Sequence, residues 1–133
     1  MASLVFFYGT LMAGFDRRRR AGIDAHLTYI GRGAIRAALF DLGLYPAAVP
    51  APDAHVWGEV YEMSDPDAVL PALDAIEGYT ADHPDRSLYV RRETDVLLPD
   101  STMATASVYF YNAPLGRAPR IRSGDYLEHV KAR

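Results

Sequence analysis

The chain has 133 residues, of which 50% are hydrophobic and 23% are charged, and its formal net charge is −3. These proportions fit one globular domain spanning residues 1–133, and the weak negative charge argues against general attraction to nucleic acid. The absence of cysteine excludes disulfides, thiolate nucleophiles and thiolate metal ligands. No apolar run approaches the roughly 20 residues that a membrane helix needs, and no basic region precedes the first apolar stretch, so we expect a cytoplasmic protein.

The first predicted strand is the apolar run that begins at residue 4 and ends at a glycine. A short, continuous and aromatic run is typical of a strand buried on both faces. Gly9 allows a sharp turn and the close approach of a ligand to the main chain. Thr10 and Leu11 follow, and the N–H groups of such a loop are able to form a site for an anion or an oxyanion. An ordinary core strand followed by a plain turn is the alternative.

Residues 17–20 are four consecutive arginines. Asp16 is able to cap a short helix that ends at Gly22. Four successive helical residues point all round the helix and not at one groove, so a solvated, ion-paired turn is favoured over a nucleic-acid site. An arginine that reaches an anionic substrate is the alternative.

Extended segments dominate the rest of the chain. We expect strands over residues 25–30, 34–42, 55–63, 88–98 and 102–112, of which the last two form a hairpin. Because Pro46, Pro50 and Pro52 restrict the backbone, residues 47–53 are predicted to form an extended loop without regular structure. One helix begins at Ser64-Asp65-Pro66, where either the serine or the aspartate is able to cap it, and ends before Gly78; a shorter helix spans residues 126–131. This pattern indicates an α+β domain with a mostly antiparallel, barrel-like sheet.

Glu77 occupies an unusual position in the first of these helices. It lies four residues after Leu73 and seven after Leu70, so it falls on their apolar stripe. It also falls in the last turn, where the helix dipole disfavours a carboxylate. Burial and the helix end both raise the pKa of a carboxyl group, and a glutamate with a pKa near neutrality is an effective acid–base catalyst. A glutamate that frays into solvent is the alternative.

Other polar side chains carry weaker signals. Glu59 and Glu62 lie on opposite faces of one strand, so one of them is expected to face solvent, and Asp74 is expected to be exposed. The four histidines are scattered without an i, i+4 pair, and the sequence predicts no metal site. It also contains no nucleophile-elbow serine and no Walker loop.

Short motifs that cover nearly the whole chain, taken in order, resemble the γ-glutamylcyclotransferase-like family. The matching segments are residues 7–11 (FYGTL), 42–47 (LGLYPA), 58–61 (GEVY), 73–79 (LDAIEGY), 89–92 (YVRR), 108–111 (VYFY) and 123–126 (SGDY). The ordered set is more specific than any one of its pieces.

The resemblance implies a small mixed β-barrel flanked by short helices, in agreement with the elements predicted above. It also implies a cofactor-independent enzyme that cleaves a small γ-glutamyl amide. In this reaction the α-amine of the substrate attacks its own γ-carbonyl, closes the ring of 5-oxoproline and releases a free amine or amino acid. At the matching positions, the resemblance makes Glu77 the general acid–base catalyst. It makes the loop of Tyr8, Gly9, Thr10 and Leu11 the segment that holds the glutamyl group.

Tyr45 and Tyr111, together with Tyr109, are further candidates to line the substrate pocket. Packing in the core is the more common role of such tyrosines and is the alternative. Arg91 or Arg92 is a candidate partner for a substrate carboxylate, although a cross-strand ion pair is favoured. The main alternative to an enzyme is a binding module of the same fold, which would hold a small carboxylate or amide without turnover. A nucleic-acid partner ranks lowest. The sequence predicts neither an oligomeric state nor the identity of the leaving amine.

Overall fold

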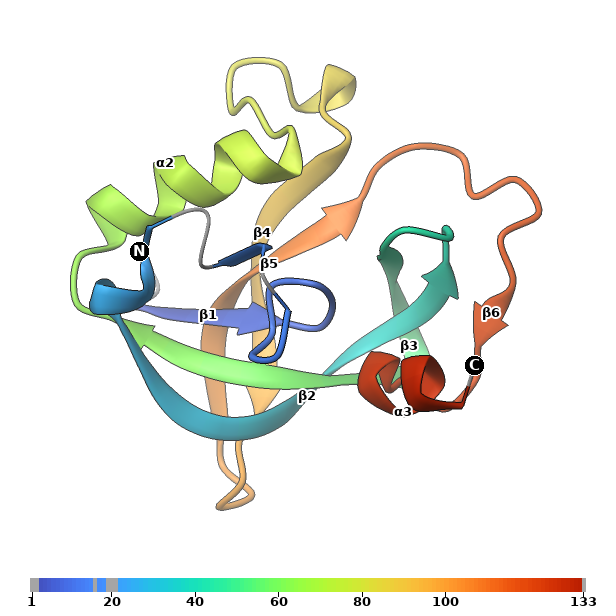
Figure 1. Cartoon of the computed structure of the whole chain (residues 1–133), viewed down its shortest axis with the longest axis horizontal. Coiled ribbons are helices and arrows are strands. Elements are labelled where there is room, and N and C mark those ends of the chain that lie inside the picture. The colour runs from blue at the N-terminus through green and yellow to red at the C-terminus, as the bar shows by residue number, and fades with distance from the viewer. Residues whose placement is uncertain (1–2, 16, 19–21, 133) are drawn as a thin grey trace.

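The computed structural model describes residues 3–15, 17–18 and 22–132 (Figure 1). The strands of the described chain are β1 (Leu4–Phe7), β2 (Leu27–Asp41), β3 (Pro46–Met63), β4 (Tyr89–Leu97), β5 (Met103–Tyr111) and β6 (Arg120–Ile121). The helices are α2 (Pro66–Glu77) and α3 (Tyr126–Lys131), with short 3-10 helices η1 (Asp24–His26) and η2 (Pro84–Arg86). No helix within these residues is long and apolar enough to cross a membrane.

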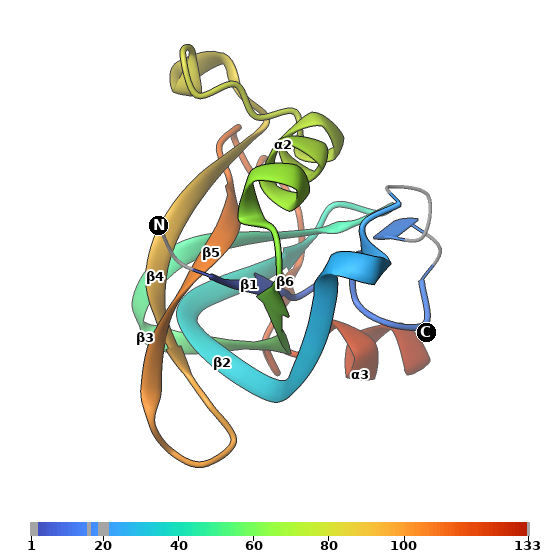
Figure 2. The ribbon, with the colours of Figure 1, turned by 90° about the vertical axis from the view of Figure 1, so that its left-hand side faces the viewer.

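The strands form one sheet in the order β3-β1-β5-β4-β2-β6, and an additional pairing between β3 and β2 closes it. β1 runs parallel to β5, with Leu4 opposite Ala106, and the other pairings between strands are antiparallel. Strands β1 to β5 therefore make a small mixed barrel, and α2 and α3 lie outside it (Figures 1 and 2). This arrangement confirms the predicted α+β fold.

β2 is one long strand, where the sequence predicted two segments over residues 25–30 and 34–42. At the junction the pairing with β3 shifts register between Tyr29 and Gly31, and Gly31 has φ of +152°. A bulge of this kind bends a strand without ending it. The bend lets β2 curve strongly around the barrel (Figure 2), where it pairs with β3, β4 and β6.

β3 corrects a second prediction, because residues 47–53 belong to this strand and not to an irregular loop. Pro46 pairs with Asp41 and Pro50 with Ala37, and the register then shifts before the pairing resumes at His55. β1 pairs only with the later part of β3, so the other edge of the proline-rich part is not covered by β1. An edge of this kind tolerates proline where the missing N–H faces away from the partner strand.

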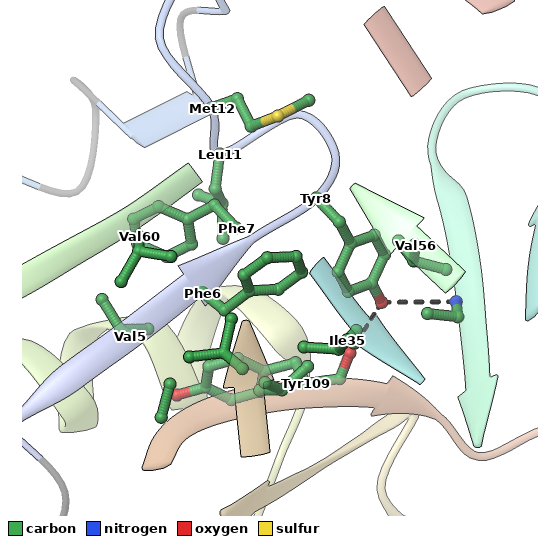
Figure 3. Close-up of a cluster of buried hydrophobic side chains, with 14 of the residues drawn as sticks. Val5, Phe6, Phe7, Tyr8, Leu11, Met12, Ile35, Val56, Val60 and Tyr109 are labelled. Carbon is green, nitrogen blue, oxygen red and sulfur yellow. Dashed lines mark hydrogen bonds between the residues drawn. The ribbon is translucent and has the colours of Figure 1, made fainter. Parts of the chain in front are cut away.

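The barrel interior is filled by aliphatic and aromatic side chains from every long strand (Figure 3). β1 is pressed closely against β3 at Gly58, where a Cβ atom would lie 2.2 Å from the carbonyl oxygen of Phe7. Because β1 has neighbours on both sides and core packing on Val5, Phe6 and Phe7, its end is held firmly in place. The first residue of the loop that follows β1 is therefore held in a defined position.

α2 follows the predicted pattern closely. Asp65 is at its N-cap position, although the Asp65 side chain makes no capping hydrogen bond, and Gly78 ends the helix in the left-handed conformation with φ of +64°. Its buried positions are Val69, Leu70, Leu73 and Glu77. The predicted apolar stripe, Glu77 included, is therefore confirmed.

Asp74 does not lie in solvent as predicted. Its carboxylate accepts two hydrogen bonds of 3.0 Å from Arg91 Nη1 and one of 2.6 Å from the hydroxyl of Tyr109. These contacts join α2 to β4 and β5, which the position of Asp74 in the sequence does not reveal. Arg91 is therefore engaged with the helix and not in a cross-strand ion pair.

Candidate functional site

A pocket opens at the end of β1, between the loop after this strand, the turn between β2 and β3, the end of α2, and strands β4 and β5. Its volume is about 350 Å³ with the open mouth included. This is at the lower end of the range for small-molecule sites. The wall is formed by Phe6, Phe7, Tyr8, Gly9, Thr10, Leu11, Arg17, Tyr45, Pro46, Glu77, Tyr89 and Tyr109.

The loop after β1 contains a tight turn in which the N–H of Met12 donates to the carbonyl of Gly9 at 3.0 Å. Thr10 and Leu11 are its central residues, and the N–H groups at such positions are not used by the turn itself. Within the described part of the chain, the N–H groups of Gly9, Thr10 and Leu11 have no hydrogen-bond acceptor. Three consecutive pocket-lining residues therefore keep backbone donors that are available to a ligand.

Two contacts hold this loop in its conformation. Gly9 packs against the ring of Pro46 so closely that a Cβ atom would lie 2.7 Å from Cγ. On the other side, the N–H of Ala13 donates to Glu59 Oε1 at 2.8 Å, and the Tyr61 hydroxyl donates to the same oxygen at 3.1 Å. Glu59 is therefore a buried anchor of the loop, whereas Glu62 is exposed as one of the pair was predicted to be.

Glu77, the last residue of α2, is 7% exposed and lines the same pocket. Burial raises the pKa of its carboxyl group from 4.5 to about 7, and the positive charge of Arg17 partly opposes this rise. Tyr8 and Tyr89 also lie within electrostatic range of this carboxyl group. No side chain or backbone group of the described residues donates a hydrogen bond to Glu77. The pocket therefore contains a carboxyl group that is free to exchange protons near neutral pH.

Tyrosine hydroxyls brace the wall of the pocket. The Tyr8 hydroxyl donates to the carbonyl of Tyr109 at 2.6 Å and accepts from the N–H of Ala48 at 3.4 Å (Figure 3). The Tyr89 hydroxyl donates to the carbonyl of Pro46 at 2.9 Å. Burial raises the pKa of both phenols, so they are neutral. Because the single hydroxyl proton of Tyr8 is used by Tyr109, this residue offers a ligand its ring and main chain.

The residues proposed for the site from sequence are mostly brought together. Glu77, Tyr45 and the loop of residues 8–11 line the pocket. Tyr111 does not line it, because its ring packs against Tyr89 with centroids 5.3 Å apart, and Tyr89 forms the wall instead. These two tyrosines are directly opposite in the β4–β5 hairpin. Sequence analysis missed Tyr89, although the hairpin register would have paired it with Tyr111.

The arginine run was only partly anticipated. Arg18 forms an ion pair of 2.7 Å with Asp24 and packs over the Tyr61 ring. Arg17 instead lines the pocket, so the prediction of a solvated turn is wrong for this residue. Asp16, predicted to cap a helix, and residues 19–21 lie outside the described residues. Across the part of the chain that the structure describes, no cluster of three or more candidate ligands is arranged to hold a metal ion.

A family profile described as gamma-glutamyl cyclotransferase, AIG2-like matches residues 5–128. The chain belongs to this family. The resemblance inferred from the short motifs is thereby confirmed. A comparison with curated proteins finds no match.

Solved structures with the same fold come from several organisms. YkqA from Bacillus subtilis is 27% identical with a TM-score of 0.72, and the match covers all of this chain but only 44% of YkqA. The protein ytfP from Escherichia coli is 28% identical with a TM-score of 0.66, over 96% of this chain and 98% of ytfP. An AIG2-like protein from Mus musculus has a TM-score of 0.72 at 23% identity, over 93% of this chain and 87% of the mouse protein, and shows the fold alone.

Proposed function

We propose that this protein is a cofactor-independent γ-glutamyl cyclotransferase, which converts a small γ-glutamyl amide into 5-oxoproline and a free amine or amino acid. In this proposal Glu77 is the general acid–base catalyst, and the loop of Tyr8, Gly9, Thr10 and Leu11 holds the glutamyl group. The observation that carries the proposal is that Glu77 and this loop line one pocket. Family membership supports the reaction class.

The chemistry asks little of the protein, because the nucleophile and the electrophile belong to the same molecule. A pocket that folds the glutamyl chain so that its α-amine faces its γ-carbonyl supplies a high effective concentration. Ionised Glu77 takes a proton from the α-ammonium group, and the amine then attacks the γ-carbon. The new C–N bond closes the ring, and the old C–N bond breaks as Glu77 passes the proton to the leaving nitrogen. The ring nitrogen then gives up its second proton through the same carboxylate, so that the lactam keeps one N–H and the amine leaves as an ammonium ion. Two proton transfers through Glu77 thus balance atoms and charges without water.

Two features of the site suit these steps. A pKa of about 7 lets Glu77 act as base and then as acid at neutral pH. The tetrahedral intermediate carries a negative oxygen, and the free N–H groups of Gly9, Thr10 and Leu11 are suitable donors for it. Loss of one such donor typically costs an enzyme roughly 3 kcal/mol of transition-state stabilisation.

A binding module that holds a small carboxylate or amide without turnover is the second candidate. The same unpaired backbone donors favour it, because they suit a bound anion as well as a transient one. The two candidates differ in what Glu77 does, since only the enzyme needs a carboxyl group that changes its protonation during each cycle.

The test is release of 5-oxoproline from γ-glutamyl amines, γ-glutamyl amino acids and glutathione, measured for the wild type, Glu77→Gln and Glu62→Gln. We expect the wild type and Glu62→Gln to be equally active, because Glu62 is exposed on β3. Glu77→Gln should lose at least roughly a hundredfold in rate. Comparable activity in Glu77→Gln would refute the assignment. Tight binding by all three proteins without product would favour the binding module.

A further inference from the structure

A second cleft is formed by β2, β3 and β6, on the side of the barrel where β6 and α3 lie (Figure 1). Its volume is about 610 Å³ with the open mouth included, which is within the range for small-molecule sites. None of the residues that line it also lines the pocket of Glu77. The cleft therefore plays no part in the cyclisation steps proposed above.

The cleft opens where β3 leaves its partner strand. Pro50 pairs with Ala37 of β2 and His55 pairs with Arg36, so residues 51–54 of β3 have no partner on β2. This excursion is a large bulge, and bulges are often found beside functional sites. It carries Asp53 in the wall of the cleft, together with His55 at the point where the pairing resumes.

β6 and the residues after it form another wall, which is held by both neighbouring strands. Ile121 pairs with Leu39 of β2, and the N–H of Trp57 on β3 donates to the carbonyl of Gly124 at 2.8 Å. Gly124 also lies so close to the carbonyl oxygen of His55 that a side chain at this position would not fit. These contacts fix the cleft in its open shape before any ligand arrives.

Two arginines give this wall a positive charge. Arg120 and Arg122 both line the cleft, on either side of the buried Ile121, and both are exposed. Among the described residues, no carboxylate forms an ion pair with either guanidinium group. In a chain whose net charge is −3, two unpaired arginines in one cleft are suited to a phosphate-bearing ligand.

Trp57 adds a flat apolar surface to the same cleft. It is 41% exposed, which is unusual for a tryptophan, and it is the only one in the chain. An exposed aromatic ring beside cations is a stacking surface for a nucleobase. Asp53, the one carboxylate in the wall, is able to accept hydrogen bonds from ribose hydroxyls. The three kinds of side chain thus match the three parts of a nucleotide.

We propose that this cleft is a second binding site, which holds a nucleotide with its base on Trp57 and its phosphates at Arg120 and Arg122. A free nucleotide is favoured over a nucleic-acid strand, because the negative net charge of the chain opposes a long polyanion. The proposal does not depend on the cyclotransferase function, since the two sites share no residue.

The test uses Trp57 as its own reporter, because no other tryptophan contributes to the fluorescence. ADP is titrated into the wild type, with excitation at a wavelength that ADP does not absorb, and calorimetry measures the dissociation constant. We expect ADP to quench the emission. Pyrophosphate lacks the base and adenosine lacks the phosphates, so each should bind at least roughly tenfold more weakly than ADP.

Variants then assign the parts of the ligand. Replacing Arg120 and Arg122 together by glutamine should weaken ADP by roughly tenfold to a hundredfold. Trp57→Ala should weaken ADP by roughly fivefold to a hundredfold and leave pyrophosphate unchanged. Arg117→Gln is the matched control, because Arg117 is also an exposed arginine between β5 and β6 but does not line the cleft, and it should bind ADP as the wild type does.

Thermal melts verify that every variant is folded. Absence of quenching at millimolar ADP overturns the inference, as does unchanged ADP affinity in the double arginine variant or an equal loss in Arg117→Gln. Pyrophosphate that binds as tightly as ADP rules out a nucleotide site, and an oligoribonucleotide that binds more tightly than ADP rules out a free nucleotide. Glu77→Gln should bind ADP normally, and a loss there would place ADP in the first pocket and overturn the inference.

Discussion

Replacing Glu77 by glutamine should make the protein more stable at pH 8 and leave its stability unchanged at pH 4. The folded protein holds the Glu77 carboxyl in a site that raises its pKa from 4.5 to about 7. Between these values the unfolded chain releases the proton while the folded protein retains it. Stability therefore falls as the pH rises through this window, and the full penalty is present above about pH 7. Glutamine has nearly the same shape and no charge, so it removes the penalty.

The size of the effect follows from the pKa difference. Each step of one in pKa corresponds to 1.36 kcal/mol, so ionised Glu77 costs the folded state about 3 kcal/mol. The side chain is only 7% exposed, so solvent screens little of this cost. The steepest part of the curve should approach the loss of about 1.4 kcal/mol per pH step expected for one proton. A residue that lowers stability at the pH where it would work is a common property of catalytic groups.

Urea denaturation of the wild type, Glu77→Gln and Glu62→Gln at intervals from pH 4 to pH 8 measures this directly. The difference in the free energy of unfolding between Glu77→Gln and the wild type should increase from zero at low pH to about 3 kcal/mol at pH 8. Glu62→Gln should follow the wild type, because Glu62 is exposed. A difference that stays flat across the pH range would refute the argument that burial of this carboxyl sets its pKa.

Three other outcomes concern contacts around the pocket. Gly9→Ala places a methyl group 2.7 Å from the Pro46 ring, so the loop has to shift. We expect a lower melting temperature and roughly tenfold slower 5-oxoproline release, both partly restored by adding Pro46→Ala. Asp74→Asn weakens the contacts that join α2 to β4 and β5, and urea denaturation should show a loss of roughly 1–3 kcal/mol; an unchanged midpoint would show that these contacts are dispensable. Arg17→Gln removes a charge that lowers the pKa of Glu77, so the rising limb of the pH–rate profile should move to higher pH. A limb that stays in place would contradict this electrostatic contact.

Elements whose ends and buried faces depend on residues close in sequence could be predicted from the sequence. α2 has a proline at its start, a glycine at its end and an apolar stripe at helical spacing, and the structure follows each of them, although the Asp65 side chain makes no capping hydrogen bond. The burial of Glu77 follows from the same spacing, because a helix turns its residues by a constant angle. The β4–β5 hairpin was equally clear from its alternation and turn residues.

The predictions failed where partners distant in sequence decide the outcome. Prolines in residues 47–53 argued against a strand, but this part of β3 pairs with β2 and not with β1, and a strand edge without a partner strand tolerates them. Asp74 occupies a helix position that predicts exposure, yet the side chain of Arg91 crosses from β4 to meet it. Arg17 belongs to a run whose composition suggests solvent, and only the folded barrel places it against the end of α2.

The parallel pairing of β1 with β5 also determines when the pocket can form. β1 is followed directly by the loop with the free N–H groups, yet its partner strands β3 and β5 come much later in the chain. Its first residue, Leu4, pairs with Glu62 and Ala106. Contacts of such long sequence separation form slowly, because the intervening chain must lose entropy first. A growing polypeptide that has not yet reached β5 lacks one wall of the pocket. Recovery of ligand binding during refolding should therefore report the closure of the barrel and not the formation of any local segment.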